Sequence, residues 1–197
     1  MKGPALIDRW LPVAELGAEA RRERKASSAL PPLYFLHVWW ARRPLVVSRA
    51  AVLGSLLPAW SPHWPAKLRR RFPDENAYRE WFLRELLGIR GDPVAARRAI
   101  ERETALGIRT AGNKYGYARA FTYTPDDEHL RVARDLIAQA WGDGEVVVAD
   151  PMAGGGSIPF EALRSGAAGG RRRAQPCGLR HPRGDPRLPG SFRGRAC

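Results

Sequence analysis

The residues best suited to carry chemistry form one run, in which an acid and three consecutive glycines follow a stretch of valines. The run reads VVVADPMAGGGSIPFEAL and spans 146–163. Because glycine lacks a Cβ, its backbone can approach a bound nucleoside closely at the end of a strand. Asp150 can accept hydrogen bonds from such a ligand or offset its positive charge. The pattern predicts a nucleoside-cofactor site in this loop.

Other interpretations of the glycine loop fit less well. A phosphate-binding P-loop requires a Lys and a Ser or Thr after the glycines, and no Lys follows here. A nicotinamide or flavin site favours G-x-G-x-x-G, but Pro159 stands where the third glycine belongs. A glycine turn that only connects a strand to a helix remains the structural alternative.

The elements around the loop indicate a strand–loop–helix unit preceded by helices. The valine run predicts a strand over 145–150, buried on both faces, and a helix follows over 157–165. A helix over 124–141 begins with Thr124 as N-cap and Pro125 at its first position. Upstream, the patterns predict helices within 19–25, from about 44 to 57, over 76–87 and over 93–103.

The order DPMAGGGS at 150–157 resembles the first motif of class I methyltransferases, D-P-F-x-G-x-G in the DNA amino-methyltransferases, with Met152 in place of the aromatic residue. Three further segments, IDRWLPVAEL at 7–16, RRERK at 21–25 and LHVWWARRPLVVSRAAVL at 36–53, resemble the opening of a large prokaryotic family described as adenine-specific DNA methylases. That family begins with a domain of unknown function and continues into D-P-F-A-G-G-G-S-I-P-x-E-A.

The resemblance implies an α/β chain: a helical N-terminal region followed by the first strand, loop and helix of a truncated class I, Rossmann-like methyltransferase fold, mostly helical as it stands. It implies S-adenosylmethionine as cofactor and an exocyclic amine of a DNA base as methyl acceptor, with adenine N6 favoured and cytosine N4 the closest variant. The implied cofactor-binding residues are Asp150, Pro151, Met152, Ala153, Gly154, Gly155 and Gly156.

Such enzymes use a D/N-P-P-Y/F tetrad to orient the target amine and stack on the flipped base. The chain contains no such tetrad, so no catalytic residue is assigned and we expect the chain to be inactive alone. The expected divisions are an N-terminal helical domain at 1–123, the start of the methyltransferase domain at 124–168 and a disordered tail at 169–197.

The charge of the chain points to an anionic partner, most simply DNA, because the formal net charge is +13 and the pI is about 10.9. Arg42 and Arg43 are candidates for phosphate contact. The loop with Lys114, Tyr115, Tyr117 and Arg119 alternates basic and aromatic residues, which suits base stacking or, equally, packing against a sheet edge. The alternative to an enzyme fragment is a non-catalytic basic DNA-binding protein.

The tail at 169–197 contains eight arginines against one acid and shows no helical or strand periodicity. Codons for Gln175 to Phe192, shifted by one base, permit N-P-V-A-Y-V-I-L-E-A-T-L-A-Y-P-A-R-F, which resembles the segment after the second strand of the methylase family. We interpret the tail as translation of a shifted frame that begins near 167–171. Sequencing the coding DNA there tests this interpretation.

Cysteine usage and the chain start indicate a cytoplasmic setting. The two cysteines, Cys177 and Cys197, encode no disulfide framework, and no His, Cys or carboxylate set has metal-ligand spacing, so no metal is expected. The opening residues lack the apolar run of a signal peptide, and no stretch approaches a membrane span.

Overall fold

The computed structural model describes residues 3–26, 43–109, 112–142, 146–165 and 174–175, and this part of the chain is mostly helical, as expected. The elements in chain order are α1 Leu6–Arg9, α2 Val13–Arg24, α4 Leu45–Leu56, α5 Ala66–Arg71, α6 Glu75–Trp81, the π-turn η1 Phe82–Leu86, α7 Pro93–Ala105, the 3₁₀ turn η2 Ala120–Thr122, α8 Asp127–Trp141, β1 Val148–Ala149, α9 Ser157–Arg164 and β2 Ala174–Gln175.

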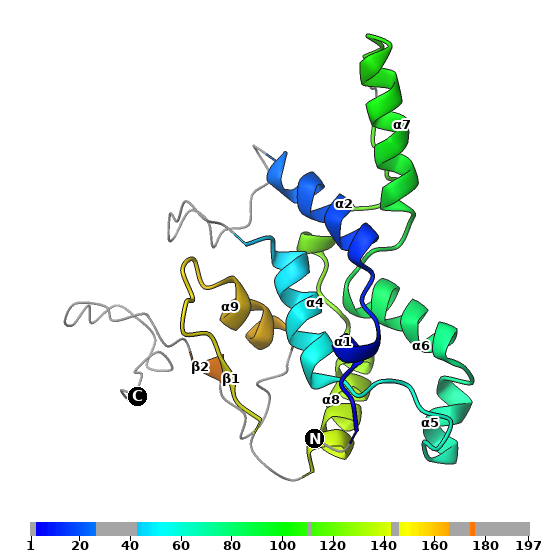
Figure 1. Cartoon of the computed structure of the whole chain (residues 1–197), viewed down its shortest axis with the longest axis vertical. Helices are drawn as coiled ribbons and strands as arrows, with labels where there is room; N and C mark the ends of the chain where they lie inside the picture. The colour runs from blue at the N-terminus through cyan, green and yellow to red at the C-terminus, as the bar shows by residue number, and fades with distance from the viewer. Residues whose placement is uncertain (1–2, 27–42, 110–111, 143–145, 166–173, 176–197) are drawn as a thin grey trace, which may run out of the picture.

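Helix α4 is the centre of the fold, and α1, α2 and α9 pack around it (Figure 1). It begins directly after Pro44, the N-cap residue, whose ψ of 135° is extended, and its apolar residues are mostly buried, with Val47 the exposed exception. Gly54 permits the close approach of α1, since a Cβ there would lie 3.2 Å from Leu11 Cδ2 and 3.4 Å from Ile7 Cβ. The long apolar sequence of α4 therefore allows it to pack against other helices on several sides.

Aspartate caps fix where three of the helices begin. The carboxylates of Asp74, Asp92 and Asp126 accept hydrogen bonds from the third backbone N–H of α6, α7 and α8, at 2.8 to 3.0 Å. The prediction that Thr124 caps α8 with Pro125 in its first turn is wrong by two residues. Asp126 takes the role because its carboxylate, a stronger acceptor than a hydroxyl, reaches the N–H of His129.

The predicted helix over 76–87 is present but ends in a wider turn. After α6 the chain forms η1, in which the N–H of Leu87 donates to the carbonyl of Phe82 at 3.0 Å. Gly88 then reverses the chain with a φ of 75°. Its missing Cβ matters, because a Cβ there would lie 2.4 Å from Cδ1 of Tyr123.

The strand is shorter and more exposed than the sequence predicts. Of the described residues in the predicted strand, only Val148–Ala149 pair, in parallel, with Ala174–Gln175. Val146 is buried but Val147 is 54% exposed, so the prediction of a strand buried on both faces is wrong. The cause is that α9 and the α4 core cover one side of β1, whereas no described element covers the other.

The tail predicted at 169–197 lies outside the described residues, apart from the two residues of β2. A membrane-spanning helix is not found among the helices of the described ranges, since none is both long and apolar enough.

Candidate functional site

The glycine loop joins β1 to α9 and leaves space where side chains would stand. Gly154 and Gly156 have φ values of 52° and 76°, a left-handed geometry that glycine adopts without strain. The N–H of Gly156 donates to the carbonyl of Ala153 at 2.8 Å, which closes the turn before α9. A Cβ built on Gly156 would meet nothing within 4 Å. The turn is thus open at Gly156, where no neighbouring group fills the space that a side chain would take.

Asp150 is the acid at the end of β1, and its carboxylate is held from two sides. The residue is only 6% exposed. Its Oδ1 accepts a hydrogen bond from the backbone N–H of Met152 at 3.0 Å, and its Oδ2 accepts one from Arg43 Nη1 at 3.3 Å. Met152, which stands where the methyltransferase motif has an aromatic residue, is 75% exposed.

Arg43 joins the site from far away in the sequence. Its backbone carbonyl accepts a hydrogen bond from Ser157 Oγ at 3.1 Å, at the first residue of α9. Its side chain is 47% exposed, so the guanidinium contacts Asp150 and also faces solvent. The start of α4 and the start of α9 are therefore fastened together at the candidate site.

The start of α4 is itself capped by α2. Both carboxylate oxygens of Glu23 accept from the backbone N–H of Leu45, at 2.9 and 3.0 Å. Because no residue within α4 caps its N-terminus, this carboxylate takes the place of a local cap and matches the positive end of the helix dipole. The backbone that carries Arg43 is fixed by this contact as well.

A fully buried ion pair holds α9 against α4. Arg49 and Glu161 are both 0% exposed, and Arg49 Nε donates to Glu161 Oε2 at 2.8 Å. Arg49 Nη1 also lies within hydrogen-bond distance of the carbonyls of Leu87 and Ala120, at 3.2 and 3.4 Å. Glu161 Oε1 lies 3.2 Å from Arg164 Nη2. The arginine thus connects α4, the π-turn, η2 and the helix that follows the glycine loop.

Burial raises the pKa of Glu161 to about 7, although the neighbouring Arg49 opposes that shift. The carboxyl group is therefore placed to change its protonation state near neutral pH. Its position one turn inside α9 links that change to the helix that carries the glycine loop.

Comparison with known proteins finds a family match over only part of the chain. Residues 10–84 match a family model described as a protein of unknown function (DUF1156). No curated protein and no solved structure matches the chain. The match covers less than half of the chain and ends before the glycine loop.

Two ion pairs reach the loop and α9 from within the DUF1156 match, that of Arg43 with Asp150 and that of Arg49 with Glu161. Glu23, Arg43 and Arg49 lie within the match, whereas Asp150 and Glu161 lie outside. The matched region is thus packed directly against the candidate site (Figure 1). The boundary predicted between 123 and 124 remains a prediction, and these contacts cross it.

The loop with Lys114, Tyr115, Tyr117 and Arg119, for which the sequence leaves base stacking and packing on a sheet edge as equal alternatives, packs against the helix α2 in the structure. The guanidinium of Arg22 lies over the rings of Tyr115 and Tyr117, 4.1 and 4.8 Å from their centroids. Tyr117 Oη donates to Glu19 Oε1 at 2.7 Å, and Lys114 pairs with Glu103 at 2.8 Å. Burial raises the pKa of Tyr117 well above its usual range. The tyrosines and the lysine of this loop are therefore engaged in contacts with α2 and α7.

Of the remaining predicted DNA contacts, Arg42 lies outside the described residues. The backbone carbonyl of Arg119 accepts a hydrogen bond from Thr122 Oγ1 at 2.7 Å. DNA contact by these residues remains a prediction.

Sequence reasoning missed Glu19, Glu23, Arg49 and Glu161. A signal for the last two was present, since each is a single charge within an otherwise apolar helical run, LVVSRAAVLGSL and SIPFEAL. Charged residues are almost never fully buried unless paired, so two such charges of opposite sign indicate partners. Glu19 and Glu23 lie one turn apart on α2 and gave no comparable signal, because nearby arginines suggested an exposed helix.

Proposed function

We propose that this chain carries the S-adenosylmethionine-binding part of a class I methyltransferase that modifies an exocyclic amine of a DNA base, with adenine N6 favoured. The observation that carries the proposal is the coincidence of the DPMAGGGS motif with an open left-handed glycine turn beside a buried acid. The segments that resemble the methylase family in the N-terminal block support it further.

The proposal assigns each residue of the site a binding role. Asp150 would accept hydrogen bonds from the ammonium group of the cofactor's methionine part, and Gly154 to Gly156 would leave room for the nucleoside. Arg43, half-exposed beside Asp150, would bind the carboxylate group. The bound cofactor supplies an electrophilic methyl group, and these residues hold it and offset its charges.

The proposal gives this chain no catalytic residue, because the D/N-P-P-Y/F tetrad is absent from its sequence. Cytosine N4 is the closest alternative acceptor, since the two reactions share that tetrad and differ in pocket shape. A modification system of this kind works on DNA in the cytoplasm, so the proposal also places the protein there.

Titration of S-adenosylmethionine into the 197-residue chain, followed by calorimetry, tests the proposal. A matched pair of variants makes the test specific. Gly156→Ala and Gly107→Ala both add a methyl group at a φ near 70°, where the structure shows open space. Both variants therefore carry a similar backbone strain. Only Gly156→Ala, which lies in the glycine loop, would also obstruct a ligand there.

We expect binding by the unmodified chain and by Gly107→Ala, and an affinity lowered by about tenfold or more in Gly156→Ala, which corresponds to about 1.4 kcal/mol. Adenosine triphosphate serves as the control ligand and should not bind. Absence of binding by the unmodified chain, or equal affinities of the two variants, would contradict the proposal.

A further inference from the structure

The helix α7 and the turn that follows it form a projecting arm, which we define as residues 93–109. In Figure 1 the far end of this arm stands clear of the other helices, while its lower part contacts α2; Glu103 also pairs with Lys114 at 2.8 Å. Of its helical residues only Pro93, at the base, is buried. A helix packed so little contributes little to a core, so its surface chemistry needs another explanation.

The arm carries cations that form no salt bridge with the described part of the chain. Arg98, Arg102 and Arg109 are exposed, and no acidic side chain in the described ranges pairs with them. This contrasts with Arg97, which donates to Glu101 at 2.7 Å on the side of the arm that faces α2. The unpaired guanidinium groups are therefore available to an external anion.

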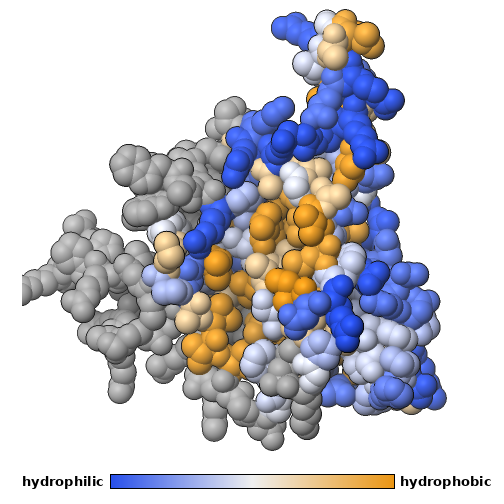
Figure 2. Space-filling view, viewed as in Figure 1, coloured by the Kyte–Doolittle hydropathy of each residue, from blue (hydrophilic) through white to orange (hydrophobic). Residues whose placement is uncertain are grey.

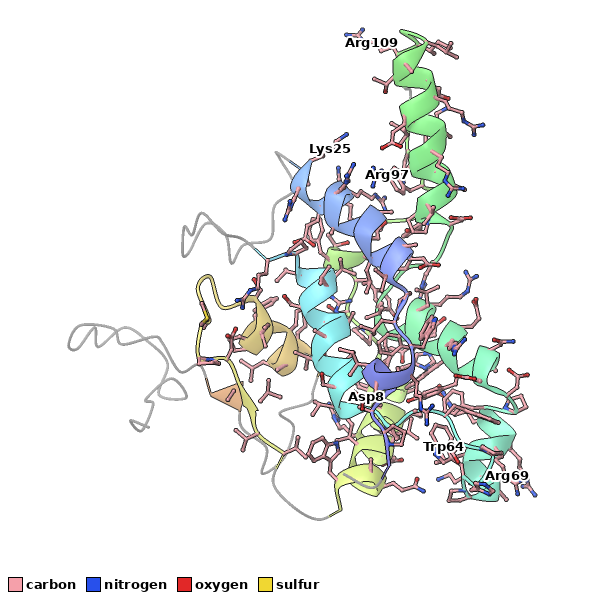
Figure 3. All side chains as sticks on the ribbon, viewed as in Figure 1. Asp8, Lys25, Trp64, Arg69, Arg97 and Arg109 are labelled. Carbon is pink, nitrogen blue, oxygen red and sulfur yellow. The ribbon has the colours of Figure 1, made fainter. Side chains whose placement is uncertain are left out.

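The end of α2, the helix beside the arm, carries two further exposed cations. Arg24, in its last turn, and Lys25, its C-cap, are exposed and form no salt bridge within the described chain, although the charge of Lys25, after those of Arg97 and Arg21, helps to lower the pKa of Glu101. The hydrophilic surface in Figure 2 runs across α2 and onto the arm. Figure 3 shows Lys25 at the end of α2, with Arg97 and Arg109 spread along the neighbouring arm. We call the exposed cations of the arm and of the end of α2, which are Arg98, Arg102, Arg109, Arg24 and Lys25, the basic ridge.

The tip of the arm is apolar and is held in a fixed turn. Gly107 adopts a φ of 70°, its N–H donates to Thr104 O at 3.1 Å, and the N–H of Ile108 donates to Glu103 O at 2.9 Å. These two bonds form a Schellman motif. The motif presents Leu106 and Ile108, which are 74% and 54% exposed.

In most Schellman motifs the apolar residue after the glycine packs back onto the helix. Here the facing residue is Glu103, whose carboxylate is paired with Lys114 at 2.8 Å, and Ile108 remains exposed. An ordered, exposed pair of large aliphatic side chains suggests a surface that becomes covered by a partner.

We propose that the basic ridge and the arm bind duplex DNA, with the arginines on the phosphates and Leu106 and Ile108 inserted against a base step. The combination favours DNA over a protein partner, because minor-groove and architectural proteins use aliphatic wedges flanked by basic residues. The choice of DNA rests on the proposed function. The site itself is separate from the glycine loop.

Fluorescence anisotropy with a labelled duplex of about 20 base pairs, between about 50 and 200 mM salt, tests the arm in the whole chain. The arm variant is Arg98→Ala with Arg102→Ala. The control is Arg69→Ala with Arg70→Ala on α5, which removes two exposed arginines elsewhere. Each variant removes two exposed arginines, and all other basic residues are the same in both.

We expect the arm variant to lower affinity by about tenfold or more and to reduce the slope of log K against log salt by about 2, and the control to change both far less. Leu106→Ser with Ile108→Ser should lower affinity without changing the slope. Circular dichroism checks that each variant keeps its helices.

Equal effects of the arm and α5 variants, an unaltered affinity in the arm variant, or no binding of DNA by the chain would overturn this inference. Titration of S-adenosylmethionine into the same variants keeps the two proposals apart. Retained cofactor binding with no role for the arm defeats only the inference, whereas DNA binding through the arm with no cofactor binding defeats only the proposed function.

Discussion

The interface between α4 and α9 and the α7 arm use arginine in opposite ways. Arg49 is wholly buried, and its guanidinium contacts a carboxylate and backbone carbonyls of three elements. Arg98 and Arg102 on the arm are exposed and have no acidic partner in the described chain. The comparison teaches that charge count alone says little about function, because part of the positive charge holds the fold together and another part faces outward.

The largest expected effect comes from removing the buried cation. Arg49→Met at pH 8 leaves the Glu161 carboxylate buried without its main partner, so we expect the free energy of unfolding to fall by about 3–5 kcal/mol. Urea denaturation followed by circular dichroism measures it. Adding Glu161→Gln to Arg49→Met should recover part of the loss, and no recovery would contradict the role given to the pair.

A second comparison uses glycines of similar backbone geometry in the two regions. Gly88→Ala forces a Cβ into the ring of Tyr123, 2.4 Å away, in addition to the strain of a φ of 75°. We expect a loss of about 2–4 kcal/mol there. Gly107→Ala on the arm meets open space and should lose only about 1 kcal/mol. Equal losses would show that the arm is packed more tightly than described.

The pH dependence of stability sharpens the account of the interface. The folded pKa of Glu161 is raised from 4.5 to about 7, so the folded chain holds a proton that the unfolded chain has released. The stability that this proton confers is fully present below pH 4.5 and is lost as the pH rises to about 7. The urea midpoint of the unmodified chain should therefore be lower at pH 8 than at pH 5, and this difference should be smaller in Glu161→Gln. An identical pH dependence in both would contradict the raised pKa.

The smallest effect is expected on the arm. Arg98→Ala removes an exposed side chain without an ion pair, so stability should change by no more than about 0.5 kcal/mol in the same urea assay. A loss approaching that of Arg49→Met would mean that the arm belongs to the folded core.

Much of the fold could be predicted because its signals are local. The apolar run of α4, Pro93 at the first position of α7 and the glycine-rich turn before α9 each determine structure within a few residues. The start of α8 was misplaced because two cap residues compete within 124–126 and the carboxylate forms the bond. The strand was overestimated because its pairing depends on residues distant in the sequence.

The candidate site was only half predictable for the same reason. The loop itself is contiguous, but its partners are distant in the sequence. Arg43 contacts Asp150, and Arg49 contacts Glu161, each across more than a hundred residues. Glu23 acts indirectly, because it caps the N-terminus of the helix that follows Arg43. No spacing rule connects such residues. The basic and aromatic pattern at 114–119 predicted two roles equally well, and the position of Arg22 between its rings could be known only from the fold.

The central claim is that the glycine loop, together with Arg43 from the DUF1156 region, binds S-adenosylmethionine. Nuclear magnetic resonance of the nitrogen-15-labelled chain during titration with the cofactor tests it most directly. The account predicts that the amide signals of Gly154, Gly155 and Gly156 and the side-chain signal of Arg43 shift together, with one affinity. Saturating cofactor that leaves these signals unmoved, or that shifts the loop without Arg43, would contradict it.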